Sequence, residues 1–261
     1  MSFVQPPGSP KVTPLSFGVP LAWYTFTTGY CFSDTGLTTP CVEGDDIKGI
    51  VDRSGNGNTL TQAVGANAPK FQNSGWSAGK PAASFSATPQ YLFSATATHP
   101  ILNRMQGADL PYTVFATIRP ALVDTQALIG WHNLVNSKIS CINSSNTTFP
   151  GTVIGALASV RTDDAASTAF SEGQNALGNL INHRAAWVST GVRIMGVLDE
   201  KVEFDAAQDV GTLTPTIFSL GTDQNTIGKF AGLCAEVIIW DRALSFQEVQ
   251  QLRGYSIREF G

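Results

Sequence analysis

The closing stretch of the chain, residues 231–261, constrains the fold more than any other segment. From Leu233 to Trp240, odd-numbered apolar residues alternate with a second set that includes Glu236. A period of two places successive side chains on opposite faces of a β-strand, and here it indicates a strand with one face in a core. The sequence therefore predicts a half-buried strand near the end of the chain.

A short amphipathic helix is predicted directly after this strand. Ser245 and Glu248 form an S-x-x-E capping box, in which each side chain satisfies a backbone N–H group at the helix start. Leu244 before the cap and Val249 after it have the spacing of a hydrophobic staple. The chain is thus expected to end in a strand, a sharp corner and a helix.

Earlier in the chain, short apolar and aromatic segments alternate with turns rich in Gly, Pro, Asn and Asp. Strand-like segments that recur about every 8–12 residues are typical of a β-sandwich or jelly roll rather than an α/β fold. No helix is predicted before Ser245, and residues 161–182 are expected to form a long connection or weak edge strands. The other predicted strands are residues 21–26, 47–51, a short strand from Leu60, 69–71, 81–85, 112–119, 127–131, 138–142, 152–157, 185–189, 193–198, 202–204 and 216–220.

The composition limits the classes of function. Charged residues make up 14% of the chain, the formal net charge is −4, and no run of basic residues occurs. These properties argue against a general nucleic-acid-binding protein, whose phosphate contacts need clustered Lys and Arg. No stretch of about 18 apolar residues predicts a membrane span, and the N-terminus lacks the charged and apolar regions of a secretory signal.

The four cysteines leave the redox state open. Cys31, Cys41, Cys141 and Cys234 include no C-x-x-C pair and have no nearby histidine at metal-ligand spacing. Cys31 and Cys41 bracket a loop and can form a disulfide in an oxidising medium. Four reduced, buried thiols are the alternative, and it is preferred for a protein made without a signal peptide.

The N-terminal segment is set apart by prolines at positions 6, 7, 10, 14 and 20. Because proline fixes φ and removes a hydrogen-bond donor, residues 1–20 are predicted to form an extended arm. This arm is interpreted either as a loose leader or as a segment that docks on a neighbouring subunit. The expected docking residues are Phe3, Val4, Pro6, Pro7 and Pro10.

Several segments carry a family resemblance. They are LAWY at 21–24, VDRSGNGNTLTQ at 51–62, GKPAASF at 79–85 and AEVIIWDRALS at 235–245. With them, residues 21–261 resemble the laminin-G-like, concanavalin A-like lectin/glucanase jelly rolls, in the variety common in bacteriophage virion proteins and bacterial surface proteins. The resemblance implies an all-β, concanavalin A-like jelly-roll β-sandwich of antiparallel strands with one short C-terminal helix. It also implies that the first and last strands pair side by side in one sheet.

The sequence offers no convincing catalytic set. Glycanases of this fold carry an E-x-D-x-x-E strand motif, whose carboxylates divide the nucleophile and acid/base roles. The nearest match contains Glu203 and Asp205, but Gln208 replaces the third carboxylate and cannot act as a general acid. No G-x-S-x-G motif accompanies the three histidines, which are His99, His132 and His183. We therefore expect the chain not to be an enzyme.

A calcium site is the one cofactor that the resemblance suggests, since laminin-G-like domains sometimes hold a cation at a loop rim. The candidate ligands are Asp45, Asp46 and Asp52, with Asn56 or Asn58. The alternative is that Asp52 and the asparagines build a turn through side-chain hydrogen bonds to the backbone. This alternative is favoured because spacing alone does not define a ligand set.

Sugar binding would need exposed aromatic rings next to polar side chains. Trp131, His132 and Asn133, at the end of a predicted strand, are the expected surface residues for such a site. Other tryptophans, such as Trp187, lie in clearly strand-like contexts and are expected in the core.

The resemblance, the missing signal peptide and the absent catalytic set favour a non-enzymatic virion structural protein of a bacteriophage, such as a head decoration, head-fibre or tail-associated subunit. It is expected to form a homo-oligomer, to assemble with other virion proteins in the host cytoplasm through its N-terminal arm, and to be exposed on the particle. The alternative is a carbohydrate-binding lectin module that recognises host-surface glycan. A glycoside hydrolase that uses Glu203 is a third interpretation. No nucleic-acid or membrane partner is expected.

Overall fold

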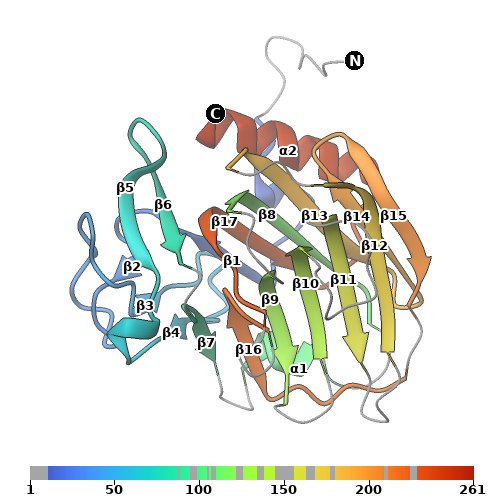
Figure 1. The fold of residues 1–261 in the computed structure, drawn as a ribbon, viewed down its shortest axis with the longest axis horizontal. Helices are drawn as coiled ribbons and strands as arrows, with labels where there is room; N and C mark the ends of the chain where they lie inside the picture. Colours follow the sequence, from blue (N-terminus) through green and yellow to red (C-terminus); the bar gives the residue numbers. More distant parts are fainter. Residues whose placement is uncertain are drawn as a thin grey trace.

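The fold consists of two antiparallel β-sheets, with a helix across the outside of one of them (Figure 1). This computed structural model describes residues 11–86, 89–94, 99–104, 106, 110–121, 126–133, 138–144, 156–162, 168–176, 180–208, 211–223 and 228–261. The predicted fold class, an all-β jelly-roll sandwich with one short C-terminal helix, is confirmed.

The first sheet has eight strands in the described part of the chain, in the order β15-β14-β13-β8-β17-β6-β5, with β1 also paired to β17. Its strands are β1 (Ala22–Thr25), β5 (Lys70–Ser77), β6 (Lys80–Phe85), β8 (Tyr112–Pro120), β13 (His183–Ser189), β14 (Arg193–Leu198), β15 (Lys201–Ala207) and β17 (Gly232–Trp240).

The second sheet has nine strands among the described residues, in the order β12-β11-β10-β9-β16-β7-β4-β3-β2. Its strands are β2 (Cys31–Phe32), β3 (Gly49–Ile50), β4 (Leu60–Thr61), β7 (Leu92–Ser94), β9 (Gln126–His132), β10 (Lys138–Ser144), β11 (Ala156–Thr162), β12 (Thr168–Ala176) and β16 (Ile217–Leu220). Buried aromatic and aliphatic side chains of both sheets, among them Tyr24 of β1 and Phe218 of β16, form one continuous core between them.

The first and last strands of the first sheet lie side by side. β1 pairs with β17 in antiparallel register, with Ala22 opposite Ile239 and Thr25 opposite Glu236. The neighbour of β17 on its other side is β8, so the last strand of the chain occupies an interior position in the sheet. The pairing that the family resemblance implies is therefore confirmed.

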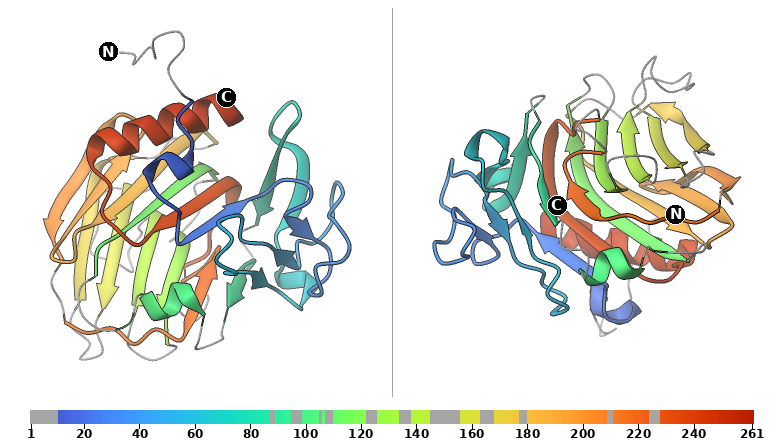
Figure 2. Two further views of the ribbon diagram at one scale, coloured as in Figure 1. Left: turned by 180° about the vertical axis from the view of Figure 1, so that it is seen from behind. Right: turned by 90° about the horizontal axis from the view of Figure 1, so that it is seen from below.

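Strand β17 is buried on both faces, whereas the sequence predicts burial of only one. Val237 and Ile239 belong to the core between the sheets. Ile238 and Trp240 pack instead in a second cluster, beneath helix α2 (Phe246–Phe260). Figure 2 shows this helix lying across the outer face of the first sheet. The alternation of side chains is confirmed, but a period of two does not reveal that a helix covers the second face.

Helix α2 begins as predicted. The N–H group of Glu248 donates to Ser245 Oγ at 3.3 Å, and the N–H group of Ser245 donates to Glu248 Oε2 at 2.7 Å, which completes the capping box. Leu244 and Val249 are buried in one cluster, as a hydrophobic staple requires. Arg242 also donates to Glu248 Oε1 at 2.8 Å, and this hydrogen bond is the main reason that the pKa of Glu248 is lowered to about 2.

Residues 11–20 differ from the predicted extended arm. They contain the 3-10 helix η1 (Pro14–Phe17), and Phe17 is buried in the cluster beneath α2. The Arg242 guanidinium donates to the Phe17 carbonyl at 2.9 Å, and Arg258 donates to the Val12 carbonyl at 2.7 Å. Pro14 suits the first position of a helix because its fixed φ is already close to the helical value. The predicted docking residues Phe3, Val4, Pro6, Pro7 and Pro10 lie outside the described residues.

Besides η1, two further short helices precede Ser245 among the described residues, although none is predicted there. They are the 3-10 helix η2 (Gly65–Asn67) and α1 (Pro100–Arg104), and both are too short to produce a recognisable periodic pattern. In the predicted connection 161–182, the structure forms strand β12 at the edge of the second sheet, which is one of the two predicted alternatives. No helix in the described part of the chain is long and apolar enough to cross a membrane.

The described cysteines are buried. Cys31, Cys41 and Cys234 are free thiols, and the side chain of Cys141 lies outside the described part of the chain. The N–H group of Cys41 donates to the carbonyl of Cys31 at 2.9 Å, which closes the loop between them. Burial raises the pKa of Cys41 to about 12. Cys31, Cys41 and Cys234 thus have free, buried thiols, and the redox state of all four cysteines stays a prediction.

Candidate ligand-binding site

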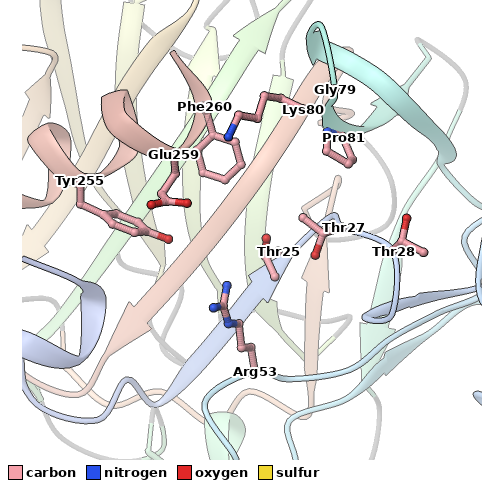
Figure 3. A pocket seen from close by; sticks show the side chains of 10 residues that line it. All are labelled: Thr25, Thr27, Thr28, Arg53, Gly79, Lys80, Pro81, Tyr255, Glu259 and Phe260. Carbon is pink, nitrogen blue, oxygen red and sulfur yellow. The ribbon is translucent and has the colours of Figure 1, made fainter. Parts of the chain in front are cut away.

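A polar pocket of about 350 Å³ opens where strand β1, the β5–β6 turn and the C-terminal end of α2 meet (Figure 3). Its volume falls within the range of about 300–1,000 Å³ that is usual for small-ligand sites. We call it the Arg53 pocket. Its lining residues are Thr25, Thr27, Thr28, Arg53, Gly79, Lys80, Pro81, Tyr255, Glu259 and Phe260.

The loop that carries Arg53 is fixed to strand β1 by the carboxylate of Asp52. Asp52 Oδ1 accepts hydrogen bonds from the N–H groups of Trp23 and Ser54, at 2.9 and 2.8 Å. Asp52 Oδ2 accepts from the N–H group of Asn58 at 3.1 Å. In addition, the N–H group of Arg53 donates to the Trp23 carbonyl at 2.8 Å. The backbone of Arg53 is therefore fixed at the floor of the pocket.

The guanidinium of Arg53 stacks on aromatic rings and is not held by hydrogen bonds. Its Cζ lies 4.1 Å from the ring centroid of Trp23 and 5.6 Å from that of Tyr30. Both distances are within the roughly 6 Å range of a cation–π interaction. Among the arginines whose side chains the structure describes, Arg53 is the one whose guanidinium has neither a hydrogen-bond nor an ion-pair partner. Each of the others forms at least one hydrogen bond or ion pair; they are Arg119, Arg184, Arg193, Arg242, Arg253 and Arg258.

Beneath the pocket, the carboxyl group of Glu236 is completely buried. Its Oε1 accepts hydrogen bonds from Trp23 Nε1 at 2.7 Å and from the Tyr255 hydroxyl at 3.0 Å. Its Oε2 is buried and has no hydrogen-bond partner in the described part of the chain. Burial raises the pKa of Glu236 to about 7, and it also raises the pKa of Tyr255, which the nearby Glu236 raises further. Glu236 thus anchors the ring on which Arg53 stacks.

The opposite wall of the pocket comes from the β5–β6 hairpin. Gly79 adopts a φ of +69°, a left-handed conformation that glycine accepts readily, and Lys80 follows at the start of β6. The N–H group of Gly79 donates to Ser74 Oγ at 3.2 Å, which holds the turn. Figure 3 shows Lys80 and Arg53 on opposite sides of the pocket, and the Glu259 carboxylate at its edge.

The predicted sugar-binding surface at Trp131, His132 and Asn133 is wrong in its main element. Trp131 has 0% exposure, and its ring lies 5.1 Å from the ring centroid of Phe218 in the core. The reason is that β9 lies between β10 and β16 in the middle of the second sheet, so Trp131 points between the sheets. His132 is buried as well, and burial lowers its pKa to about 4, while Asn133 is half-buried.

The predicted calcium ligands do not converge on one site. Asp46 pairs with Lys70 at 2.6 Å, and Asp45 accepts a hydrogen bond from the N–H group of Val42 at 2.9 Å. Asp52 is used by the turn hydrogen bonds that position Arg53, which is the alternative role predicted for it. Within the described residues, no group of three or more His, Cys, Asp or Glu side chains is arranged to hold a metal ion.

The remaining candidate carboxylates are engaged elsewhere. Asp205 forms an exposed ion pair with Arg193 at 3.0 Å, and Gln208 donates to Ser159 Oγ at 3.3 Å. Glu203 is 9% exposed. These residues of strand β15 and its end therefore do not form the open row of carboxylates that the glycanase motif requires.

No sequence pattern indicates the Arg53 pocket. The run Asp52–Asn58 is read correctly as a turn, but no local pattern shows that Arg53 lies over Trp23. The other walls come from Lys80 and from Tyr255, Glu259 and Phe260, which are far from Arg53 in the sequence. The pairing of β17 with both β1 and β6 brings these segments together.

Comparisons with known proteins agree with the fold. At the level of sequence, no protein-family model and no curated protein matches this chain. Domain 4 of AbnA, a GH43 extracellular arabinanase from Geobacillus stearothermophilus solved with arabinotriose, superposes with a TM-score of 0.56 at 16% identity, over 90% of this chain and 98% of that one. The binding domain of botulinum neurotoxin serotype G superposes with a TM-score of 0.60 at 10% identity, over 91% of this chain and 51% of that one.

A leech intramolecular trans-sialidase is a third structural neighbour, with a TM-score of 0.50 at 14% identity, over 63% of this chain and 26% of that one. This chain therefore spans about half of the neurotoxin chain and about a quarter of the trans-sialidase chain. At such low identities the likeness shows a shared β-sandwich fold and nothing more.

Proposed function

We propose that this chain is a carbohydrate-binding module that acts without catalysis, and that its sugar ligand binds in the Arg53 pocket. The observation that carries the proposal is the state of Arg53. Its backbone is fixed by hydrogen bonds, its guanidinium is stacked on Trp23 and Tyr30, and its donor groups have no partner within the described residues. A pre-positioned, unused donor group at the floor of a pocket is a typical ligand-binding element.

The other lining residues suit a sugar. Thr25, Thr27 and Thr28 bring hydroxyl groups to one side, and Tyr255 and Phe260 add aromatic carbon to the other. Sugars present several hydroxyl groups together with an apolar ring face, so they match a pocket of mixed character. The fold supports the same function, since the arabinanase domain with this fold was solved with arabinotriose and the neurotoxin domain is named as a binding domain.

The test is glycan binding with a matched pair of variants. A glycan array finds the ligands, and titration calorimetry then measures Kd for the unmodified protein, Arg53→Gln and Arg193→Gln. A hydrogen bond to a charged group contributes about 1.5–3 kcal/mol, so Arg53→Gln is expected to weaken binding roughly tenfold to a hundredfold. Arg193, which forms only exposed contacts with Asp205 and its neighbours, is the control and is expected to leave Kd unchanged. Absence of any glycan binding, or equal loss in both variants, would overturn the proposal.

The absence of catalysis has its own test. Incubation with every glycan that the protein binds is expected to release no reducing sugar. Release that disappears in Glu203→Ala would contradict the non-enzymatic function and would favour the glycoside hydrolase interpretation.

The virion role stays a prediction from the family resemblance, and a glycan-binding subunit exposed on a particle is compatible with it. Residues 11–20 pack on the sandwich, so removal of the whole predicted arm would also damage the fold. Deletion of residues 1–10 is the cleaner experiment. Loss of incorporation into particles is expected if this segment docks the protein, and unchanged incorporation would contradict the docking role.

A further inference from the structure

We infer that the ligand of the Arg53 pocket is a sugar that carries a carboxylate, as a hexuronic acid or a sialic acid does. This inference rests on the proposed function and names the ligand class of the same site. The charge of the pocket favours such a ligand. Arg53, Lys80 and Glu259 line the pocket, so the formal charge of its lining is +1, and the buried carboxyl group of Glu236 lies beneath this lining. Neither cation has an ion-pair partner within the described part of the chain, although the whole chain has a net charge of −4.

The geometry of Arg53 also favours a carboxylate. A guanidinium is planar, and its N–H groups lie in its plane, where two of them can bind both oxygens of one carboxylate. Stacking on Trp23, with Cζ at 4.1 Å from the ring centroid, uses the face of the group. The edge with its donors stays available to the pocket. A neutral sugar hydroxyl satisfies one such donor, whereas a carboxylate satisfies two and neutralises the charge.

The remaining wall of the pocket suits the hydroxyl groups of such a sugar. Glu259 adds an acceptor for sugar hydroxyl groups, and Thr25, Thr27 and Thr28 add groups that both donate and accept. A ligand for this pocket therefore needs one negative group and several hydroxyl groups. A phosphate monoester carries a charge of about −1.5 to −2 at pH 7 and would be repelled more strongly by Glu259. A carboxylated sugar meets both requirements with a single charge.

The experiment compares sugars that differ in the acid group. Galacturonic acid trimer is compared with galactose trimer, and sialyllactose with lactose, so that the two arms distinguish the two sources of the carboxylate. A sulfated galactoside tests whether charge alone is sufficient. In calorimetry we expect at least one acidic sugar to bind tenfold or more tightly than its neutral partner, and to lose affinity as salt is raised.

Variants assign this difference to the pocket. Arg53→Lys keeps the charge but loses the planar fork, and we expect a loss of about tenfold for the acidic sugar. Lys80→Gln is expected to weaken binding of the acidic sugar several-fold more than binding of its neutral partner, and Glu259→Gln is expected to strengthen binding of the acidic sugar. Lys201→Gln, an exposed cation on β15 outside the pocket, is the matched control. Circular dichroism spectra that match those of the unmodified protein establish that each variant is folded.

The outcomes separate this inference from the proposed function. Equal binding of neutral and acidic sugars, lost in Arg53→Gln, would overturn the carboxylate and leave the glycan-binding function standing. A sulfated sugar that binds as tightly as the carboxylated one would also overturn it. If no sugar binds at all, the proposed function fails first. If an acidic sugar binds tightly and its Kd is unchanged in Arg53→Lys and in Lys80→Gln, its site lies elsewhere on the protein, and the inference is overturned.

Discussion

Among the described residues, Trp23 and Trp76 each have an arginine guanidinium over the ring, and the two arrangements use the arginine differently. At Trp76, Arg119 and Arg184 lie 5.1 and 5.8 Å from the ring centroid. Arg119 donates to Asn182 Oδ1 at 2.6 Å, while Arg184 donates to Ser256 Oγ at 3.2 Å and to the Gly261 carbonyl at 2.8 Å. At Trp23, Arg53 lies closer to the ring, at 4.1 Å, yet its guanidinium has no such partner in the described residues.

The ring nitrogens show the opposite distribution. Trp23 Nε1 donates to the buried Glu236, whereas Trp76 Nε1 is buried with no hydrogen-bond partner among the described residues. At Trp76, hydrogen bonds therefore anchor the arginines. At Trp23, a hydrogen bond anchors the tryptophan ring instead. A cation–π contact alone therefore does not distinguish a structural arginine from one that can bind a ligand. The distinction lies in whether the donors of the guanidinium are already used.

The largest effect is expected when an anchored arginine is removed. Arg184→Met leaves Ser256 and the Gly261 carbonyl without their buried donor, and each hydrogen bond to a charged group contributes about 1.5–3 kcal/mol. We expect the free energy of unfolding to fall by about 4 kcal/mol, measured by urea denaturation. Arg193→Met, at an exposed position, is the control. A loss below about 1 kcal/mol would show that the Trp76 arrangement is not structural.

The anchor of the Trp23 ring is expected to make stability depend on pH. The pKa of Glu236 is raised to about 7 from an ordinary value of 4.5, so the folded protein retains a proton that the unfolded chain releases between these values. The contribution of Glu236 is therefore complete below about pH 4.5, and is lost as pH rises through 7. Glu236→Gln imitates the protonated form, and at pH 8 it is expected to be more stable than the unmodified protein by about 3 kcal/mol.

Denaturation curves at pH 4.5 and pH 8 check this prediction. His132, whose pKa is lowered to about 4, has the opposite effect, because its contribution is lost as pH falls. The difference between the variant and the unmodified protein cancels this contribution and isolates Glu236. A difference that stays constant over this pH range would refute the buried, proton-binding carboxylate.

A smaller effect is expected from the helix that contacts both sites. Helix α2 supplies Ser256 to the Trp76 arrangement and Tyr255 to the Trp23 arrangement. Ser245→Ala removes its capping side chain and is expected to reduce the free energy of unfolding by about 1 kcal/mol. Thermal denaturation measures the change, and Gln247→Ala, at an exposed position in the first turn of the same helix, is the control. No change would mean that tertiary packing alone fixes the start of the helix.

The smallest change in stability is expected at Arg53. An exposed cation–π contact contributes about 0.5–1 kcal/mol, so Arg53→Met is expected to lower the free energy of unfolding by no more than this amount. Glycan binding is nevertheless expected to be lost. A destabilisation as large as that of Arg184→Met would remove the contrast between the two arrangements.

Much of the architecture could be predicted from local patterns. The strand that ends at Trp240, the capping box at Ser245 and the turn built on Asp52 all depend on neighbours within a few residues, so their signals survive in the sequence. Trp131 could not be placed in the same way. Its position after a short apolar run is compatible with an exposed strand end, and only the interior position of β9 determines that it is buried. The Arg53 pocket is invisible for a related reason, since its walls come from opposite ends of the chain.

The pairing of β17 with β8 on one side and with β6 and β1 on the other has a consequence for the order of folding. A ribosome delivers this central strand after the other described strands of its sheet, so the sheet must stay open until residue 240 has been synthesised. Contacts between segments so distant along the chain are expected to make closure slow. The Arg53 pocket, whose wall includes Tyr255 and Phe260, forms only after that closure. The time at which the protein gains glycan binding would therefore report when the sheet closes.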